Sequence, residues 1–172
     1  MSRRKRNYAM LIVVALFLLF AIQAGAEVTQ EKGQIVYHVV KAEVIKVDDV
    51  PGHVVGIVDF RGLNLMDTGE IATYTTKVTF DYINGNGTHW AYSQNTFDDG
   101  SVTRAKAQGT TRSLPNGVSE FKGTYTTIGG TGRWEGVQGE GTYSGKRMAP
   151  LTPGGPADCY QEWSGTRILP SR

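Results

Sequence analysis

A glycine-rich hairpin over residues 121–143 constrains the fold of this chain more than any other stretch. Residues 121–127 alternate between polar side chains and a face of Phe, Gly, Tyr and Thr, and residues 137–143 alternate in the same way. That spacing is typical of two β-strands. Between them, residues 129–132 read Gly-Gly-Thr-Gly, which can take positive φ without strain, so the chain is predicted to reverse there.

Glycines spaced two apart in a strand cost stability unless a backbone or a large side chain comes very close. A small, strongly coiled barrel provides that reason, and we expect Tyr125 or Trp134 to lie over the bare backbone at Gly139 and Gly141. Trp134 is out of phase with Val137, which predicts a bulge or twist directly after the turn.

The run Ile-Gly-Gly-Thr-Gly-Arg-Trp-Glu-Gly-Val-Gln-Gly at 128–139 resembles a signature of the allene oxide cyclase and dirigent barrels. It is most similar to the cyclase version, which also carries an aromatic residue, Glu and Gly at the positions of Trp134, Glu135 and Gly136. The looser similarity extends over residues 69–147. The resemblance implies a cofactor-free barrel that is usually trimeric. An N-terminal export signal, a single cysteine and Gly/Thr-rich strands indicate a secreted or periplasmic bacterial member.

The remaining chain reads as further strands joined mostly by short turns, with no long helix after the N-terminal segment. The expected strands outside the hairpin cover residues 34–47, 53–65, 72–82, 88–97, 101–112 and 159–169, and residues 27–33 are expected to be loose. The sequence therefore predicts an all-β fold, an eight-stranded antiparallel up-and-down barrel. Closure of the barrel removes the exposed edges of the sheet.

The first 26 residues have the three parts of a secretory signal peptide. Four basic residues at 3–6 precede an uncharged run from Tyr8 to Ile22, and Ala-Gly-Ala at 24–26 forms the cleavage site. A retained membrane anchor is the alternative, although a spanning helix needs about 20 apolar residues. We expect residues 27–172 to form a single domain that is secreted or periplasmic and has no membrane contact after cleavage.

The charge balance changes when residues 1–26 are removed. The full chain has 18 Lys and Arg against 16 Asp and Glu, and residues 1–26 hold four of the basic residues and none of the acidic ones. The remaining chain carries a net charge of −2, so the electrostatic footprint of a nucleic-acid-binding protein is missing. Cys159 is the single cysteine, which excludes an intramolecular disulfide and favours a buried apolar role.

Residues 34–47 and 53–65 are apolar on both faces. A strand that is buried on both faces needs cover on its outside, which predicts that these strands contribute to a subunit interface. The alternative is a bulge that switches the inward face midway along the strand.

The residues that could carry chemistry are few. His38, His53 and His89 have no metal-ligand spacing, so no metal is expected, and no cofactor motif is present. A carboxylate that faces an apolar interior would have a raised pKa and could act as an acid or base. Glu43 and Glu135 are the weak catalytic candidates; Glu135 is interpreted first as a turn or hydrogen-bond anchor.

Aromatic residues are the richer set of candidates. Several lie on faces expected to point inward, where they could line a pocket for an apolar or aromatic small molecule. The predicted ligand-binding residues are Tyr74, Tyr82, Trp90, Tyr92, Tyr125, Tyr143 and Trp163. A face of small residues from Thr103 to Thr111 indicates space inside the barrel.

Three functions follow from this pattern. The first is a secreted barrel that binds an apolar or aromatic molecule, with isomerase or cyclase activity as the resemblance to allene oxide cyclases implies. The second is a non-catalytic carrier or stereochemical guide, like a dirigent protein or a lipocalin. The third is a structural envelope protein whose barrel is filled by side chains.

Overall fold

The computed structural model describes residues 27–115, 117–151 and 157–170. The predicted signal peptide, residues 1–26, lies outside this part of the chain. Among the residues that the structure describes, no helix is long and apolar enough to cross a membrane.

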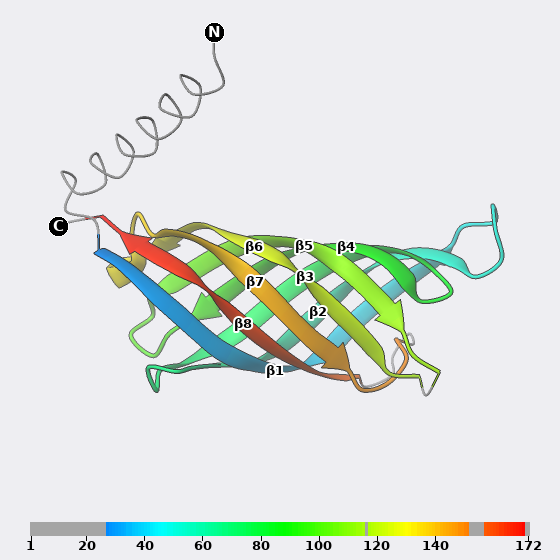
Figure 1. Cartoon of the computed structure of the whole chain (residues 1–172), viewed down its shortest axis with the longest axis horizontal. Coiled ribbons are helices and arrows are strands. Elements are labelled where there is room, and N and C mark those ends of the chain that lie inside the picture. The colour runs from blue at the N-terminus through cyan, green and yellow to red at the C-terminus, as the bar shows by residue number, and fades with distance from the viewer. Residues whose placement is uncertain (1–26, 116, 152–156, 171–172) are drawn as a thin grey trace, which may run out of the picture.

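The described residues form a closed barrel of eight antiparallel strands, as predicted (Figure 1). Each strand pairs with the next one in the sequence, and β8 pairs with β1 to close the sheet. The strands are β1 (Glu27–Lys46), β2 (His53–Met66), β3 (Ile71–Ile83), β4 (Asn86–Thr96), β5 (Val102–Ser113), β6 (Ser119–Thr131), β7 (Gln138–Arg147) and β8 (Asp158–Leu169). β1 begins at Glu27, so the expectation that residues 27–33 are loose was wrong: these residues pair with the last part of β8.

The barrel has two ends, which are named here for later use. The terminal end holds the start of β1, the end of β8 and the turns at 67–70, 97–101 and 132–137; the far end holds the turns at 47–52, 84–85 and 114–118. A short 3₁₀ helix, η1 (Gly132–Trp134), forms part of the turn between β6 and β7. It explains why Trp134 is out of phase with Val137: the turn brings both side chains into the interior, where both are buried.

Glycines let the large interior rings lie directly on the sheet. A Cβ added at Gly141 would lie 2.7 Å from Cε1 of Tyr125, and one added at Gly145 would lie 2.6 Å from Cζ of Phe121. The expected packing of Tyr125 over Gly141 is therefore confirmed, whereas Trp134 lies against Gly130. A ring on one strand that covers bare backbone on the next explains the spacing of glycines that the sequence shows.

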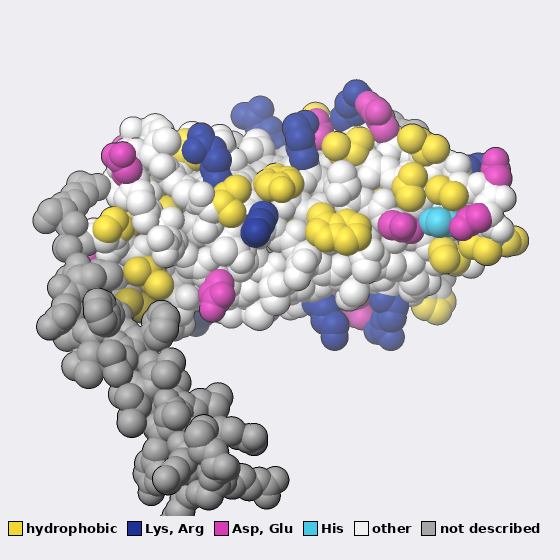
Figure 2. Space-filling model, turned by 90° about the horizontal axis from the view of Figure 1, so that it is seen from above, with side chains coloured by type: hydrophobic (Ala, Val, Ile, Leu, Met, Phe, Trp, Pro, Cys, Tyr) yellow, Lys and Arg dark blue, Asp and Glu magenta, His cyan; other side chains and the backbone are white. Residues whose placement is uncertain are grey.

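The inward face of β1 changes halfway along the strand. The pairing with β2 shifts between Val39 and Lys41, so Tyr37 and Val39 face inward before the shift and Ala42 and Val44 face inward after it. This is the bulge that the sequence offered as the alternative to an interface. β2 keeps its pairing with β3 throughout and still exposes apolar side chains such as Leu63 and Leu65. Figure 2 shows apolar side chains gathered in small groups among polar ones on one face of the molecule.

Candidate functional site

A cavity of about 160 Å³ lies inside the barrel and is lined by residues from all eight strands. The small side chains of β4 and β5 leave this space: Ala91 and Ser93 lie beside Ala107 and Ala105, and all four line the cavity. We call these four residues the small-residue wall. The predicted inward face of small residues on β5 is thereby confirmed, since its charged neighbours Arg104 and Lys106 are exposed.

The structure brings five of the seven predicted ligand-binding residues together at this cavity. They are Tyr74, Tyr82, Tyr125, Tyr143 and Trp163. Their role in binding stays a prediction, but their inward position is as expected.

Trp90 and Tyr92 were placed on the wrong face of β4, because they lie outside the barrel with exposed fractions of 49% and 66%. His89 and Ala91 take the inward positions instead. Both faces of this strand contain ring side chains, so alternation alone does not distinguish inside from outside. The registers with β3 and β5 decide it, since they set His89 opposite Phe80 and Gly109.

A chain of hydrogen bonds crosses the interior around His89. Its Nε2 lies 2.7 Å from the Tyr143 hydroxyl and its Nδ1 lies 3.1 Å from Oγ1 of Thr111, which in turn lies 2.8 Å from the Tyr82 hydroxyl. Burial lowers the pKa of His89 to about 4. The ring is therefore neutral at physiological pH, and one nitrogen donates while the other accepts.

A second polar group is formed by amide side chains. Trp163 donates from Nε1 to Oδ1 of Asn64 at 2.9 Å, and Asn64 donates to Asn95 at 3.1 Å. Asn95 donates to Oγ1 of Thr103 at 3.2 Å. These groups satisfy one another, as buried polar groups must to avoid a cost in free energy.

The Tyr125 hydroxyl lines the cavity and makes no hydrogen bond to another described residue. It reaches over Gly165, the residue that pairs with Glu31 of β1. Burial, and then the charge of Glu31, raise the pKa of Tyr125 to about 12. This hydroxyl is therefore protonated and free to donate to a bound molecule.

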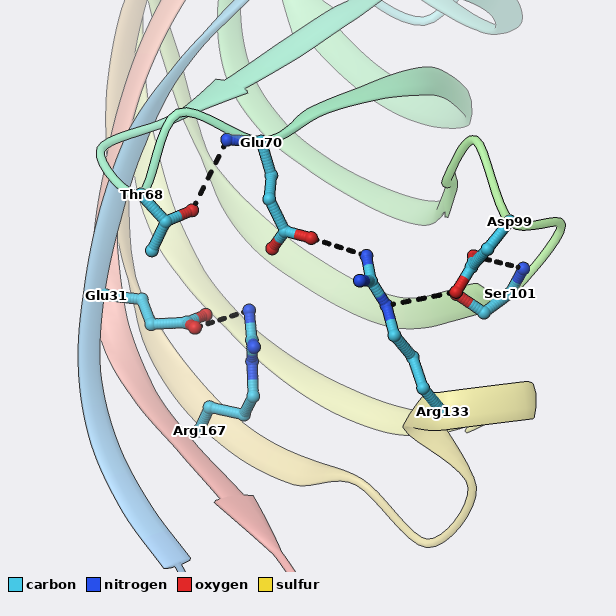
Figure 3. A network of polar contacts seen from close by, with 7 residues as sticks. All are labelled: Glu31, Thr68, Glu70, Asp99, Ser101, Arg133 and Arg167. Atoms are coloured by element: carbon cyan, nitrogen blue, oxygen red, sulfur yellow. Dashed lines mark hydrogen bonds and ion pairs between the residues drawn. The ribbon is translucent and has the colours of Figure 1, made fainter.

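Among the described residues, Glu31 is the carboxylate that lines the cavity, and it forms an ion pair with Arg167 of β8 (Figure 3). Each side chain keeps an exposed fraction of 14%. Burial raises the pKa of Glu31, Arg167 opposes that shift, and Glu70 adds to it. Glu31 continues the inward phase of Gly33 and Ile35, so the sequence contains a signal for its position, but the expectation that residues 27–33 are loose excluded it from the candidates.

The two carboxylates proposed from sequence do not reach the cavity. Glu43 lies outside and pairs with Lys41 at 2.5 Å, and Glu135 is exposed directly after η1. Glu43 points outward because the bulge in β1 turns its neighbours Ala42 and Val44 inward. Cys159 is buried, as expected, and burial raises its pKa to about 12.

A second arginine, Arg133, links two turns of the terminal end (Figure 3). Arg133 lies 2.5 Å from Glu70 and 3.4 Å from Asp99, which belong to two different turns. Its guanidinium group lies 4.7 Å from the centre of the Phe97 ring and 4.8 Å from that of Trp134. Arg167 contacts the same Trp134 ring at 3.9 Å, so the terminal end is filled by stacked rings and paired charges.

No group of His, Cys, Asp and Glu side chains suited to a metal ion occurs among the described residues. The cavity is lined mainly by apolar and aromatic side chains, together with neutral His89, the Tyr125 hydroxyl, the Glu31–Arg167 pair and Arg147.

Comparison of the sequence with protein-family models and with curated proteins gives no match. The structure resembles that of the pterocarpan synthase dirigent protein GePTS1, with a TM-score of 0.51 and 13% identity over 85% of this chain and 88% of that chain. The pterocarpan synthase dirigent protein PsPTS1 gives a TM-score of 0.45, with 13% identity over 85% of this chain and 97% of that chain. The chain thus has the barrel fold of a dirigent protein, while the cyclase part of the sequence resemblance stays a prediction.

Proposed function

We propose that this protein binds a small ring compound inside its barrel and holds or guides that compound without changing it chemically. The observation that carries the proposal is the cavity of about 160 Å³ between the small-residue wall and the interior tyrosines. A barrel filled by side chains, as in a purely structural protein, would leave no such space.

The size of the cavity limits the ligand. A dry protein cavity of about 150 Å³ takes up one benzene molecule, whereas drug-sized ligands occupy about 300–1,000 Å³. The cavity of about 160 Å³ thus suits a single aromatic or alicyclic ring. A long lipid chain would require several interior side chains to move.

The fold comparison supports a guiding role, since the similar structure is described as a pterocarpan synthase dirigent protein. Aromatic neighbours on several strands and the Tyr125 hydroxyl, free to donate to a substituent, would restrict the orientation of a ring in the cavity. Fixing the orientation of a bound molecule is the physical basis of steering its later reaction.

Isomerase activity is the second candidate, and Glu31 favours it. A buried carboxylate with a raised pKa can take or give a proton, and the Tyr125 hydroxyl beside it could stabilise a developing oxyanion. The ion pair with Arg167 holds the Glu31 carboxylate in place, but Arg167 also competes with a substrate proton for that carboxylate. Glu31→Gln would abolish turnover if the protein is an isomerase, and it would leave the affinity for a ring ligand largely intact if it is a carrier.

We place this function outside the cytoplasm, because residues 1–26 have the pattern of an export signal.

A homotrimer is proposed as well, with exposed apolar residues of β1 and β2 such as Val36 and Leu63 at the contact. Native mass spectrometry of the protein without residues 1–26 tests the subunit number and shows any retained ligand.

Binding of one-ring and two-ring probes tests the proposal directly. We expect toluene and phenol to bind by ligand-observed NMR, and biphenyl to bind far more weakly. Ala107→Leu fills the small-residue wall and should abolish binding, whereas Lys106→Leu places the same side chain on the outer face of β5 and should not. Equal binding by the Ala107→Leu variant, or no binding of either one-ring probe, would contradict the proposal.

A further inference from the structure

Arg147 is a charged residue of the cavity whose role differs from that of Arg167. It is the last residue of β7, lies at the far end of the barrel, and lines the cavity. Its Nε donates to the carbonyl oxygen of Ala149 at 3.1 Å, and its Nη2 donates to Oγ of the buried Ser119 at 2.9 Å. These two bonds fix the guanidinium group and leave three of its five N–H groups unused.

Within the described residues, Arg147 has no carboxylate within 4.0 Å. The acidic residues of the same end face outward: Glu120 binds Arg112 and Lys146 on the outer surface, and Asp158 is exposed. The segment 152–156 reads Thr-Pro-Gly-Gly-Pro, so it contains no acidic side chain. A half-buried guanidinium group without an anion is costly, and proteins usually pair it.

The charge of Arg147 acts on the interior of the barrel. Burial raises the pKa of Tyr37, Tyr82 and Cys159, and in each case Arg147 opposes the shift. An anion bound at this place would therefore be favoured by the guanidinium group while its carbon skeleton lies against aromatic neighbours. Tyr37, Tyr82 and Cys159 all line the cavity.

We propose that Arg147 binds the carboxylate of the cavity ligand, which makes the ligand a small monocyclic carboxylic acid. This inference rests on the proposed function, because it assumes that a ring compound occupies the cavity. The unused N–H groups lie on the two terminal nitrogens, and this pair matches the two oxygens of a carboxylate. The cavity leaves space for one ring behind such a group, so an aromatic or alicyclic acid fits and a fatty acid does not.

Three probes of nearly equal size test the proposal: benzoate, benzamide and toluene. Hydrogen bonds to charged groups are the stronger ones, so at pH 7 we expect benzoate to bind the wild-type protein about tenfold or more tightly than benzamide. Arg147→Met should abolish this preference, and Arg147→Lys should retain part of it, because the charge remains and the planar fork is lost. Arg112→Met removes an outer arginine of the adjacent strand pair and serves as the control.

The outcomes separate the two proposals. If toluene binds and benzoate has no advantage over benzamide, the role of Arg147 is wrong and the ring-binding function stands. If none of the three probes binds, the proposed function itself fails. The wild-type ratio of benzoate to benzamide needs no variant, so the test holds even if Arg147→Met folds poorly; circular dichroism of each variant reports its folding.

Discussion

Two arginines project into the barrel, Arg167 near the terminal end and Arg147 at the far end, and their surroundings differ. Arg167 is neutralised by Glu31 and stacked on Trp134, whereas Arg147 is held by neutral acceptors. The same side chain thus completes a structural cluster at one end and leaves an unbalanced positive charge at the other. We infer that Arg167 has a structural role at the terminal end, whereas Arg147 at the far end is available to bind an anion.

Two features of the Glu31, Arg167 and Trp134 cluster at the terminal end are unfavourable for stability. Burial of Glu31 outweighs the pairing with Arg167 in setting its pKa, and Nε1 of Trp134 is buried without a hydrogen-bond partner. Desolvation of a buried pair can exceed the Coulomb energy that the pair returns. The Glu31–Arg167 pair is therefore expected to add little net stability, although each charge depends on the other.

The largest expected effect follows from breaking the pair. Arg167→Met leaves Glu31 in the interior without a counter-ion, and removal of one partner of a buried pair costs about 3 kcal/mol. The free energy of unfolding, measured by urea denaturation followed by tryptophan fluorescence, should fall by this amount at pH 7. The double variant Glu31→Met, Arg167→Met should recover most of the loss, since it removes both charges; if the double variant is as unstable as the single one, packing rather than charge explains the result.

Acid should weaken the middle of the barrel, between the two arginines. The pKa of His89 is lowered from about 6.5 to about 4 by burial, so the unfolded chain binds a proton that the folded chain excludes. Stability is then lost as the pH falls from about 6.5 toward 4, by on the order of 2 kcal/mol. Unfolding curves of the wild type and of His89→Gln over this range check it, and the variant should show the flatter pH dependence.

Two other groups, Glu31 and His53, have the opposite effect on the pH dependence of stability and serve as internal controls. The folded-state pKa values of Glu31 and His53 are raised, the former by burial and the latter by hydrogen bonds to Asp49 and Asp81. Each therefore contributes stability at low pH that is lost as the pH rises. A His53→Gln variant that flattens the acid loss, instead of steepening it, would contradict the assignment of that loss to His89.

A smaller effect is expected from the turns of the terminal end. Arg133→Met removes the ion pairs with Glu70 and Asp99 and the contacts with the Phe97 and Trp134 rings, a loss of about 1 kcal/mol. Arg112→Met removes an exposed pair with Glu120 and should cost about 0.5 kcal/mol or less. Thermal unfolding of both variants tests the ranking; equal shifts would mean that the turns are not tied by Arg133.

The sequence predicted the barrel well because the barrel depends on local patterns. Alternation, the turn glycines and the packing of Tyr125 over Gly141 are all set by residues near one another in the chain. The start of β1 was missed because residues 27–33 are mostly polar; they form a strand through pairing with β8 at the opposite end of the sequence.

The site was predicted less well for the same reason. Which face of β4 points inward depends on its registers with β3 and β5. These registers place His89 and Ala91 inside the barrel, where Trp90 and Tyr92 had been expected. The Glu31–Arg167 pair joins the first and last strands, so no spacing in the sequence indicates it. Position on a strand could be predicted, whereas partners across a closed barrel could not.

A near-neutral effect on stability is expected at Arg147, and this variant tests the comparison of the two arginines most directly. Arg147→Met loses the bonds to Ser119 and Ala149, which costs about 1 kcal/mol, but it also removes an unpaired cation from the interior, which offsets that cost. The free energy of unfolding should therefore stay within about 1 kcal/mol of the wild type, in contrast to the loss in Arg167→Met. If Arg147→Met lowers the free energy of unfolding as much as Arg167→Met does in the same urea titration, both arginines are structural. The proposed difference between the two ends of the barrel would then be wrong.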